Sequence, residues 1–156
     1  CPVLGQKPRI AQIIDNLLTN AASFTPLGGR VFLTTQQRDG EALLLIADEG
    51  PGLAADTQEK IFERFYTDRS AQPTRDKAYG SSLGHSGLGH SGLGLSISRQ
   101  IARAHGGDLI ADNRPDGTGA YFTLSLPLAD SPPKRKRSRE IGREIGKDAG
   151  KEPHDL

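Results

Sequence analysis

Apolar residues recur at helical spacing in the first part of the chain. Between Pro8 and Phe24, one stripe contains Ile10, Ile13, Ile14, Leu17, Leu18 and Ala21. A stripe of this period predicts an amphipathic helix, and a proline fits well in its first turn. We therefore expect a helix from Pro8 to about Phe24. Asn16 and Asn20 are four residues apart, so they lie one above the other beside this stripe.

Two further helices are expected later in the chain. The glycines Gly92 and Gly94 lead into the first, whose apolar positions are Leu93, Ile97, Ile101 and Ala104. It should end at His105-Gly106, because a basic residue followed by glycine is a typical helix end. The other is short and covers about 57–65.

Four stretches have the pattern of β-strands. The ranges 30–38 and 41–48 are joined by Asp39-Gly40, a strong hairpin signal. The second of them is almost continuously apolar, as is typical of a central strand. The other two are 108–113 and 120–126. In the last one we expect Ala120, Phe122, Leu124 and Leu126 to point inward and Tyr121, Thr123 and Ser125 outward. Helices against one antiparallel-rich sheet favour a two-layer α/β sandwich.

Two segments lack such patterns. Residues 66–91 show no clear periodicity, and so long a connection is either disordered or a functional lid; within it Leu83-Gly84-His85-Ser86-Gly87 repeats at 88–92. Residues 129–156 form a charged tail that we expect to be disordered. Its part from 134 to 156 holds eight basic and five acidic residues, so the rest of the chain carries −2 of the overall +1.

Composition narrows the possible functions. The body of the chain is slightly acidic, which argues against nucleic-acid binding, and the basic run 134–137 is more typical of a solvated tail than of a targeting patch. A single cysteine, Cys1, excludes an internal disulfide and a thiolate zinc site. The sequence has no apolar run long enough to span a bilayer and no signal-peptide pattern. We therefore expect a cytoplasmic segment, anchored to a membrane only through other parts of a longer protein.

The polar residues and glycines suggest a nucleotide site without a Walker loop. Asn20 can offer an amide oxygen to Mg²⁺, and Asp48, at the end of the apolar strand, can accept a hydrogen bond from the adenine amino group. Glycines after Asp48 let a base approach the backbone, and the glycine-led helix start favours phosphate. Each feature alone has a plain alternative: a helix-terminal polar residue, a turn former and a flexible loop.

The order of these features resembles one family. The stretches 16–21 (NLLTNA), 48–52 (DEGPG), 61–66 (IFERFY) and 91–96 (SGLGLS) are similar to the asparagine, first glycine, phenylalanine and second glycine boxes of the catalytic ATP-binding domain of sensor histidine kinases. Residues 117–127 resemble the closing glycine box and the final strand. The likeness covers roughly 5–128 and is greatest to alphaproteobacterial kinases of the ChvG/ExoS type, within the GHKL/HATPase family.

This resemblance implies the Bergerat fold, an α+β two-layer sandwich whose mixed, mainly antiparallel sheet of about five strands packs on three helices. It implies a domain over 1–128 with an ATP lid at 66–91. Asn20 would hold Mg²⁺, and Asn20, Arg64 and Arg69 would be the catalytic residues. The ATP-binding residues would be Asn16, Asn20, Phe24, Asp48, Gly50, Gly52, Tyr66, Ser91, Gly92, Leu93, Gly94 and Leu95.

Some residues depart from the family pattern. Ser23 stands where relatives often have a basic residue, and His90 where many have a glycine. Related ATPases have a glutamate base at the place of Asn16, so phosphoryl transfer is favoured over hydrolysis. None of the four histidines lies in a phosphoacceptor motif. The resemblance thus implies γ-phosphoryl donation from ATP–Mg²⁺ to a histidine on a separate dimerisation domain, which then phosphorylates a response regulator. The alternatives are a non-catalytic nucleotide-binding module and a GHKL-type ATPase.

Overall fold

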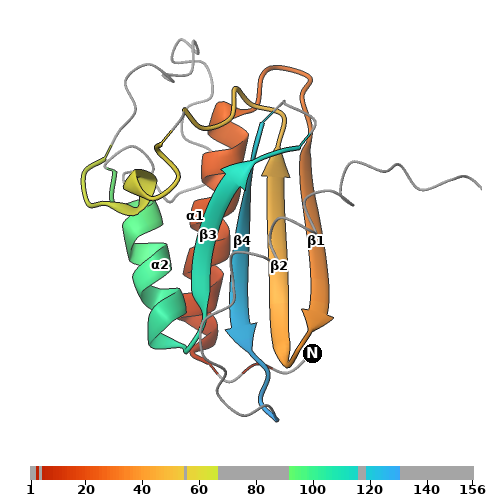
Figure 1. The fold of residues 1–156 in the computed structure, drawn as a ribbon, viewed down its shortest axis with the longest axis vertical. Helices are drawn as coiled ribbons and strands as arrows, with labels where there is room; N and C mark the ends of the chain where they lie inside the picture. Colours follow the sequence, from red (N-terminus) through yellow and green to blue (C-terminus); the bar gives the residue numbers. More distant parts are fainter. Residues whose placement is uncertain (1–2, 4, 55, 67–91, 116–118, 131–156) are drawn as a thin grey trace, which may run out of the picture.

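The computed structural model describes residues 3, 5–54, 56–66, 92–115 and 119–130. Within these residues it contains two α-helices, one short 3-10 helix and four strands. In chain order they are α1 (Lys7–Phe24), β1 (Val31–Arg38), β2 (Glu41–Asp48), η1 (Lys60–Phe62), α2 (Gly94–Ala104), β3 (Asp108–Asn113) and β4 (Ala120–Pro127). Figure 1 shows the helices on one side of the sheet, so the expected two-layer α+β sandwich is confirmed.

The sheet has the order β1-β2-β4-β3, and every pairing in it is antiparallel. The hairpin between β1 and β2 turns at Asp39 (φ 52°) and Gly40 (φ 82°). Two consecutive positive φ values match the right-handed twist of the flanking strands. The register places Val31 opposite Asp48, so β1 begins beside the end of β2. Because β2 pairs with both β1 and β4, it lies inside the sheet, as its apolar sequence predicts.

The element counts differ from expectation. The described residues contain four strands rather than about five, all antiparallel rather than mixed, with a single further bridge between Val3 and Leu128. The short helix expected at about 57–65 is a 3-10 helix of three residues, Lys60–Phe62. It ends at Glu63, whose extended backbone (φ −73°, ψ 148°) does not continue a helix.

The main core lies between the sheet and α1. Ile13, Leu17 and Ala21 of α1 are fully buried against the inward residues of β4, as the two alternating patterns predict. Tyr121, Thr123 and Ser125 point away from this core, as the alternation predicts, yet all three are at most 3% exposed. They lie on the other face of the sheet, where Tyr121 packs with Leu43 and Leu45 of β2 in a second apolar cluster.

The buried face of α2 is not the one that its apolar residues predict. Ser96, Ser98 and Ala102 are buried, Leu95 and Ile101 pack partly against the core, and Ala104 is exposed. α2 runs beside α1 in the opposite direction, so that His105 meets Gln6 and Gly94 meets Asn16. Small residues at such a contact let two helices approach closely, and a stripe of large apolar residues does not predict this kind of contact.

Candidate nucleotide site

The candidate site is organised along α1. Asn16 contacts the first turn of α2, where an ideal Cβ on Gly94 would lie 3.7 Å from the Asn16 side chain. Phe24, the last residue of α1, contacts the loop after β2, where a Cβ on Gly50 would lie 2.9 Å from the Phe24 carbonyl oxygen. Asn20 is one helical turn, about 6 Å, from each. The two glycine boxes and the asparagine box therefore meet on one helix.

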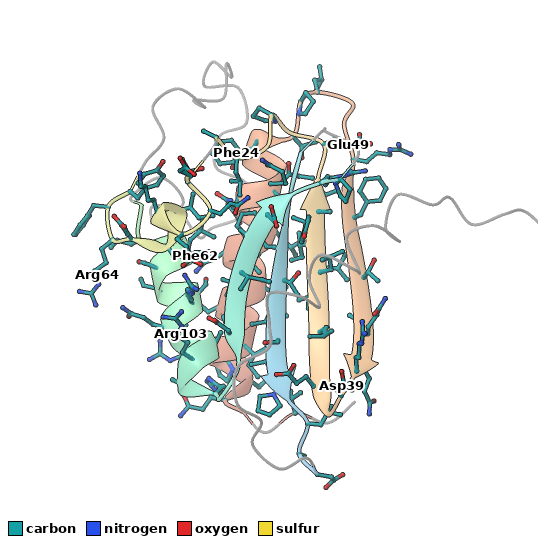
Figure 2. The ribbon with its side chains drawn as sticks, viewed as in Figure 1. Phe24, Asp39, Glu49, Phe62, Arg64 and Arg103 are labelled. Carbon is teal, nitrogen blue, oxygen red and sulfur yellow. The ribbon has the colours of Figure 1, made fainter. Side chains whose placement is uncertain are left out.

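Figure 1 shows the same convergence, since the C-terminal ends of α1 and β2 and the start of α2 lie toward one end of the molecule. In Figure 2, Phe24 and Glu49 mark this end and Asp39 the opposite one. The side chain of Asn20 is partly exposed and makes no hydrogen bond to another described residue. Its amide oxygen is therefore free to bind a ligand.

Asp48 is the buried acid of the site. It is 3% exposed, and its Oδ1 accepts hydrogen bonds from the backbone N–H groups of Gly50 (2.9 Å) and Ala120 (3.2 Å). Burial raises the pKa of the Asp48 carboxyl, although these two bonds and the charge of Arg114 act to lower it. The second oxygen, Oδ2, accepts no bond from a described residue and so remains an acceptor. An acceptor fixed in this way suits a ligand N–H group.

The loop after Asp48 is held by Gly119, which lies within the stretch that resembles the closing glycine box, and by Asn113, which the sequence did not single out. Gly119 (φ 88°) packs so closely that a Cβ on it would overlap the carbonyl oxygen of Asp48. Asn113, at the end of β3, accepts a bond from the Leu53 N–H (2.6 Å) and donates one to the Leu53 oxygen (2.9 Å). A side-chain amide can make this reciprocal pair because it carries both a donor and an acceptor. Gly52 (φ 79°) lies against the same amide.

A charged pair supports the loop from the side of β1. Glu49 accepts bonds from the Arg30 backbone N–H (2.9 Å) and from its guanidinium (3.0 and 3.1 Å). These bonds from Arg30 lower the pKa of Glu49. The guanidinium groups of Arg30 and Arg114 both lie over the Phe32 ring, at 5.2 and 5.1 Å. The pair of Arg30 and Glu49 thus links the residue before β1 to the residue that follows Asp48.

The N-terminus of α2 carries no side-chain cap and no acidic residue in its first turn. Leu93 is at the cap position, and its oxygen accepts bonds from the Ile97 N–H and the Ser96 hydroxyl. Unpaired N–H groups at a helix start attract anions, and Asp or Glu nearby would compete with one. Leu95 instead points into the core, so its expected part in the site can only be played by its backbone.

Phe65 and Gly92, which flank the segment expected to form a lid, contact each other. The Phe65 N–H donates to the Gly92 oxygen at 3.0 Å, and Tyr66 packs partly against the core. Residues 67–91, including Arg69 and Ser91, lie outside the described residues, as does the tail 131–156. Arg64 is exposed, and in Figure 2 its side chain extends outward from the molecule. Its expected catalytic role stays a prediction.

A second cluster of charges joins η1, α2 and β3. The guanidinium of Arg99 lies 4.5 Å over the Phe62 ring and bonds Glu59 (2.8 Å) and Asp108 (3.2 Å). Burial alone would raise the pKa of Asp108, but bonds from Arg103, the Leu109 N–H and Arg99 outweigh it and lower the pKa. A hollow of about 320 Å³ lies beside this cluster. Its lining residues are Glu59, Phe62, Glu63, Ser96, Arg99, Gln100 and Arg103, which include none of the expected nucleotide ligands.

Neither a metal cluster nor a membrane span is found in the described part of the chain. It contains no group of three or more histidine, cysteine, aspartate and glutamate side chains placed to hold a metal ion. Among the same residues, no helix has the length and hydropathy needed to span a membrane.

Comparison with known proteins gives a consistent result. Residues 5–130 match the family described as histidine kinase-, DNA gyrase B-, and HSP90-like ATPase. The chain is 44% identical over 134 residues to the sensor protein ChvG of Agrobacterium fabrum, covering 83% of this chain and 20% of that protein. The chain thus spans about a fifth of the length of this relative.

Solved structures resemble the fold. The mycobacterial sensor histidine kinase MprB is 32% identical with a TM-score of 0.63, covering 80% of this chain and 74% of that one. Full-length ShkA, solved in complex with AMPPNP, is 30% identical with a TM-score of 0.63, covering 86% of this chain and 25% of that one.

Proposed function

Because this chain belongs to the family of histidine kinase-, DNA gyrase B-, and HSP90-like ATPases, we propose that it is the ATP-binding catalytic domain of a sensor histidine kinase. The domain covers 1–128 and includes the ATP lid at 66–91. A charged tail at 129–156 follows it. It binds ATP with Mg²⁺ and donates the γ-phosphoryl group to a histidine on a separate dimerisation domain. A response regulator then receives the phosphoryl group. The domain acts in the cytoplasm, where ATP is available.

The observation that carries this proposal is the geometry of Asp48. One of its oxygens is occupied by two backbone N–H groups, and the other is left to accept a bond from a ligand. The adenine amino group is a donor that fits this acceptor, and Gly50 and Gly52 let the loop beside it pack closely against Phe24 and Asn113. The AMPPNP complex of the similar protein ShkA supports a nucleotide as the ligand.

The triphosphate and its metal are assigned to the glycine-led helix and to Asn20. The uncapped start of α2 offers N–H groups to phosphate oxygens. Mg²⁺ commonly binds through one or two protein oxygens together with phosphates and water, so the free amide oxygen of Asn20 fits such a metal without any acidic cluster. Mg²⁺ would neutralise phosphate charge there during transfer.

Transfer is favoured over hydrolysis by the chemistry of Asn16. Its amide, unlike a carboxylate, has no basicity with which to activate water. The acceptor histidine belongs to another domain. Among the described residues the one histidine, His105, has both ring nitrogens engaged, one with the Ile101 oxygen (2.7 Å) and the other with the Gln6 N–H (3.1 Å).

The test combines this chain with ATP, Mg²⁺ and the separately produced dimerisation domain of the same kinase. We expect acid-labile, alkali-stable phosphate on that domain and little phosphate release by the chain alone. Tight ATP binding without phosphohistidine would instead support a non-catalytic module. Rapid phosphate release by the chain alone would support an ATPase.

A further inference from the structure

The side chain of Asn16 is turned toward α2 rather than toward open space. Its Nδ2 donates to the Gly94 carbonyl oxygen (3.3 Å) and to the Ser98 hydroxyl (3.1 Å). A carbonyl oxygen only accepts, so the group facing Gly94 must be the NH₂ and not the amide oxygen. The orientation of the amide is therefore fixed by its partners.

Both amide hydrogens of Asn16 are used in these two bonds. Asn16 has no further donor to offer a phosphate oxygen, and a direct contact with a nucleotide could run only through its Oδ1. Ser98 is fully buried, and α2 has no other described side-chain bond to α1 near its start. The amide of Asn16 is thus the polar link between the two helices at this point.

We propose that Asn16 is a positioning residue that holds the first turn of α2 at a set place relative to Asn20. Asn20 lies one turn along the same helix, so the link fixes the metal ligand and the phosphate-binding turn with respect to each other. This inference rests on the proposed function, because it assigns both groups to one Mg²⁺–ATP. Ser98 acts as the partner that completes the link.

The two possible roles of Asn16 respond in opposite ways to Asn16→Asp. The aspartate carboxylate still offers an oxygen to a metal ion or its bound water, and it is a stronger ligand than an amide oxygen. However, the substitution removes both N–H donors of the Asn16 amide and places negative charge beside the Gly94 oxygen. Positioning therefore predicts that Asn16→Asp weakens Mg²⁺–ATP binding by about tenfold, whereas a direct metal role predicts equal or tighter binding. Ser98→Ala, which loses one of the two bonds, should weaken it by about threefold.

The experiment measures affinities of the whole chain for Mg²⁺–ATP and for adenosine by titration calorimetry. We expect both variants to lose affinity for Mg²⁺–ATP and to keep adenosine binding within about twofold of the parent chain. The double variant Asn16→Asp/Ser98→Ala should bind no more weakly than Asn16→Asp alone, since both changes break one link. Ser125→Ala changes a buried serine of β4 whose hydroxyl accepts a bond from the Asp108 N–H of β3. It is the matched control and should leave both affinities unchanged.

Unchanged Mg²⁺–ATP affinity in Asn16→Asp, or losses that add in the double variant, would overturn the inference while leaving the proposed function intact. Absence of ATP binding by the parent chain would overturn the proposed function and the inference with it. If Asn16→Asp does not fold, Ser98→Ala decides alone, because alanine is a good helix former. An unchanged affinity in that variant counts against the link.

Discussion

The backbone N–H of Phe65 donates a hydrogen bond of 3.0 Å to the carbonyl oxygen of Gly92. This bond connects the described residues that come before and after 67–91. Both residues have positive φ angles, 65° and 67°. Such a conformation is uncommon for a phenylalanine, and Phe65 is also 72% exposed. The contact ties Gly92, two residues before the start of α2, to the residues after η1, so it fixes where the glycine-led turn begins.

Gly92→Ala should open this contact. A Cβ at Gly92 would stand 2.8 Å from the Cα of Phe65 and from the Tyr66 oxygen, both of which are backbone atoms. We expect a loss of about 1–3 kcal/mol in the free energy of unfolding and at least tenfold weaker ATP binding. Urea unfolding and ATP titration measure the two effects.

Gly28→Ala is the matched control for that variant. Gly28 has a similar φ of 82° but no atom within 4 Å of an added Cβ. It should show the backbone strain alone and leave ATP affinity unchanged. Equal ATP affinities in the two variants would show that the contact does not position the site.

The parts of the fold that the sequence predicted are those coded by local signals. The stripe of α1, the Asp39-Gly40 turn and the apolar run of β2 each fix an element without reference to the rest of the chain. Asp48 could be identified because it is the acid that directly follows the apolar run of β2, so the strand itself places the carboxyl at its end. The likeness to a family then placed these elements in order.

The parts that the sequence did not predict depend on contacts between distant elements. Ser98 and Ala102 are buried because α2 lies against α1, and nothing in the local pattern of α2 indicates that contact. Asn113 and Gly119 support the Asp48 loop from β3 and from the turn before β4, 60 or more residues along the chain. An asparagine at a strand end is too common to signal this role, whereas Gly119 lies in the stretch 117–127 that resembles the closing glycine box, although its contact with Asp48 could not be predicted.

Asn20→Ala should reduce ATP affinity mainly in the presence of Mg²⁺. The side chain makes no hydrogen bond to another described residue, so its removal should cost little stability, and alanine favours a helix. We expect about tenfold weaker binding with Mg²⁺ and less than twofold with EDTA. A similar loss under both conditions would mean that Asn20 contacts the nucleotide directly. Gln12→Ala is the control, because it removes an amide of the same helix that bonds Arg9, and it should have no effect on ATP affinity.

Ser23→Lys should strengthen ATP binding. The Ser23 hydroxyl donates to the Thr19 oxygen within α1 (2.7 Å) and so has no distant partner to lose. It lies three residues after Asn20, hence on the same side of the helix, where a lysine can reach phosphate charge. We expect a gain of about three- to tenfold at low salt that shrinks as ionic strength rises. Ser23→Gln, of similar length but neutral, should show no gain.

Asp108 should make stability depend on acidic pH. Its folded-state pKa lies below its ordinary value, so the stability it contributes is present above the unfolded pKa of about 3.9 and is lost as pH falls through the lowered pKa. Asp108→Asn should therefore cost about 1 kcal/mol at pH 7 and progressively less below pH 4. Urea unfolding between pH 3 and 8 tests this. Arg103→Ala, which removes the more exposed of its two arginine partners, should cost under about 0.5 kcal/mol.

Asp48→Asn should separate stability from nucleotide recognition. Burial raises the pKa of Asp48, so its neutral form stabilises the fold at low pH and that contribution is lost as pH rises through the raised pKa. The charged form is therefore the costly one at neutral pH. The asparagine oxygen can still accept the bonds from Gly50 and Ala120, and the variant should unfold at equal or higher urea concentration at pH 7.

The same substitution replaces the free acceptor Oδ2 by an NH₂ group, which would face the donor amino group of adenine. A buried donor without a partner costs about 1–3 kcal/mol, so ATP affinity should fall by about ten- to a hundredfold. In the parent chain, ATP affinity should also weaken as pH falls through the raised pKa, because the protonated carboxyl is a poorer acceptor. Asp39→Asn, at an exposed turn, is the control for both measurements. An Asp48→Asn variant that is destabilised yet binds ATP normally would assign Asp48 to the fold alone and remove adenine from this end of β2.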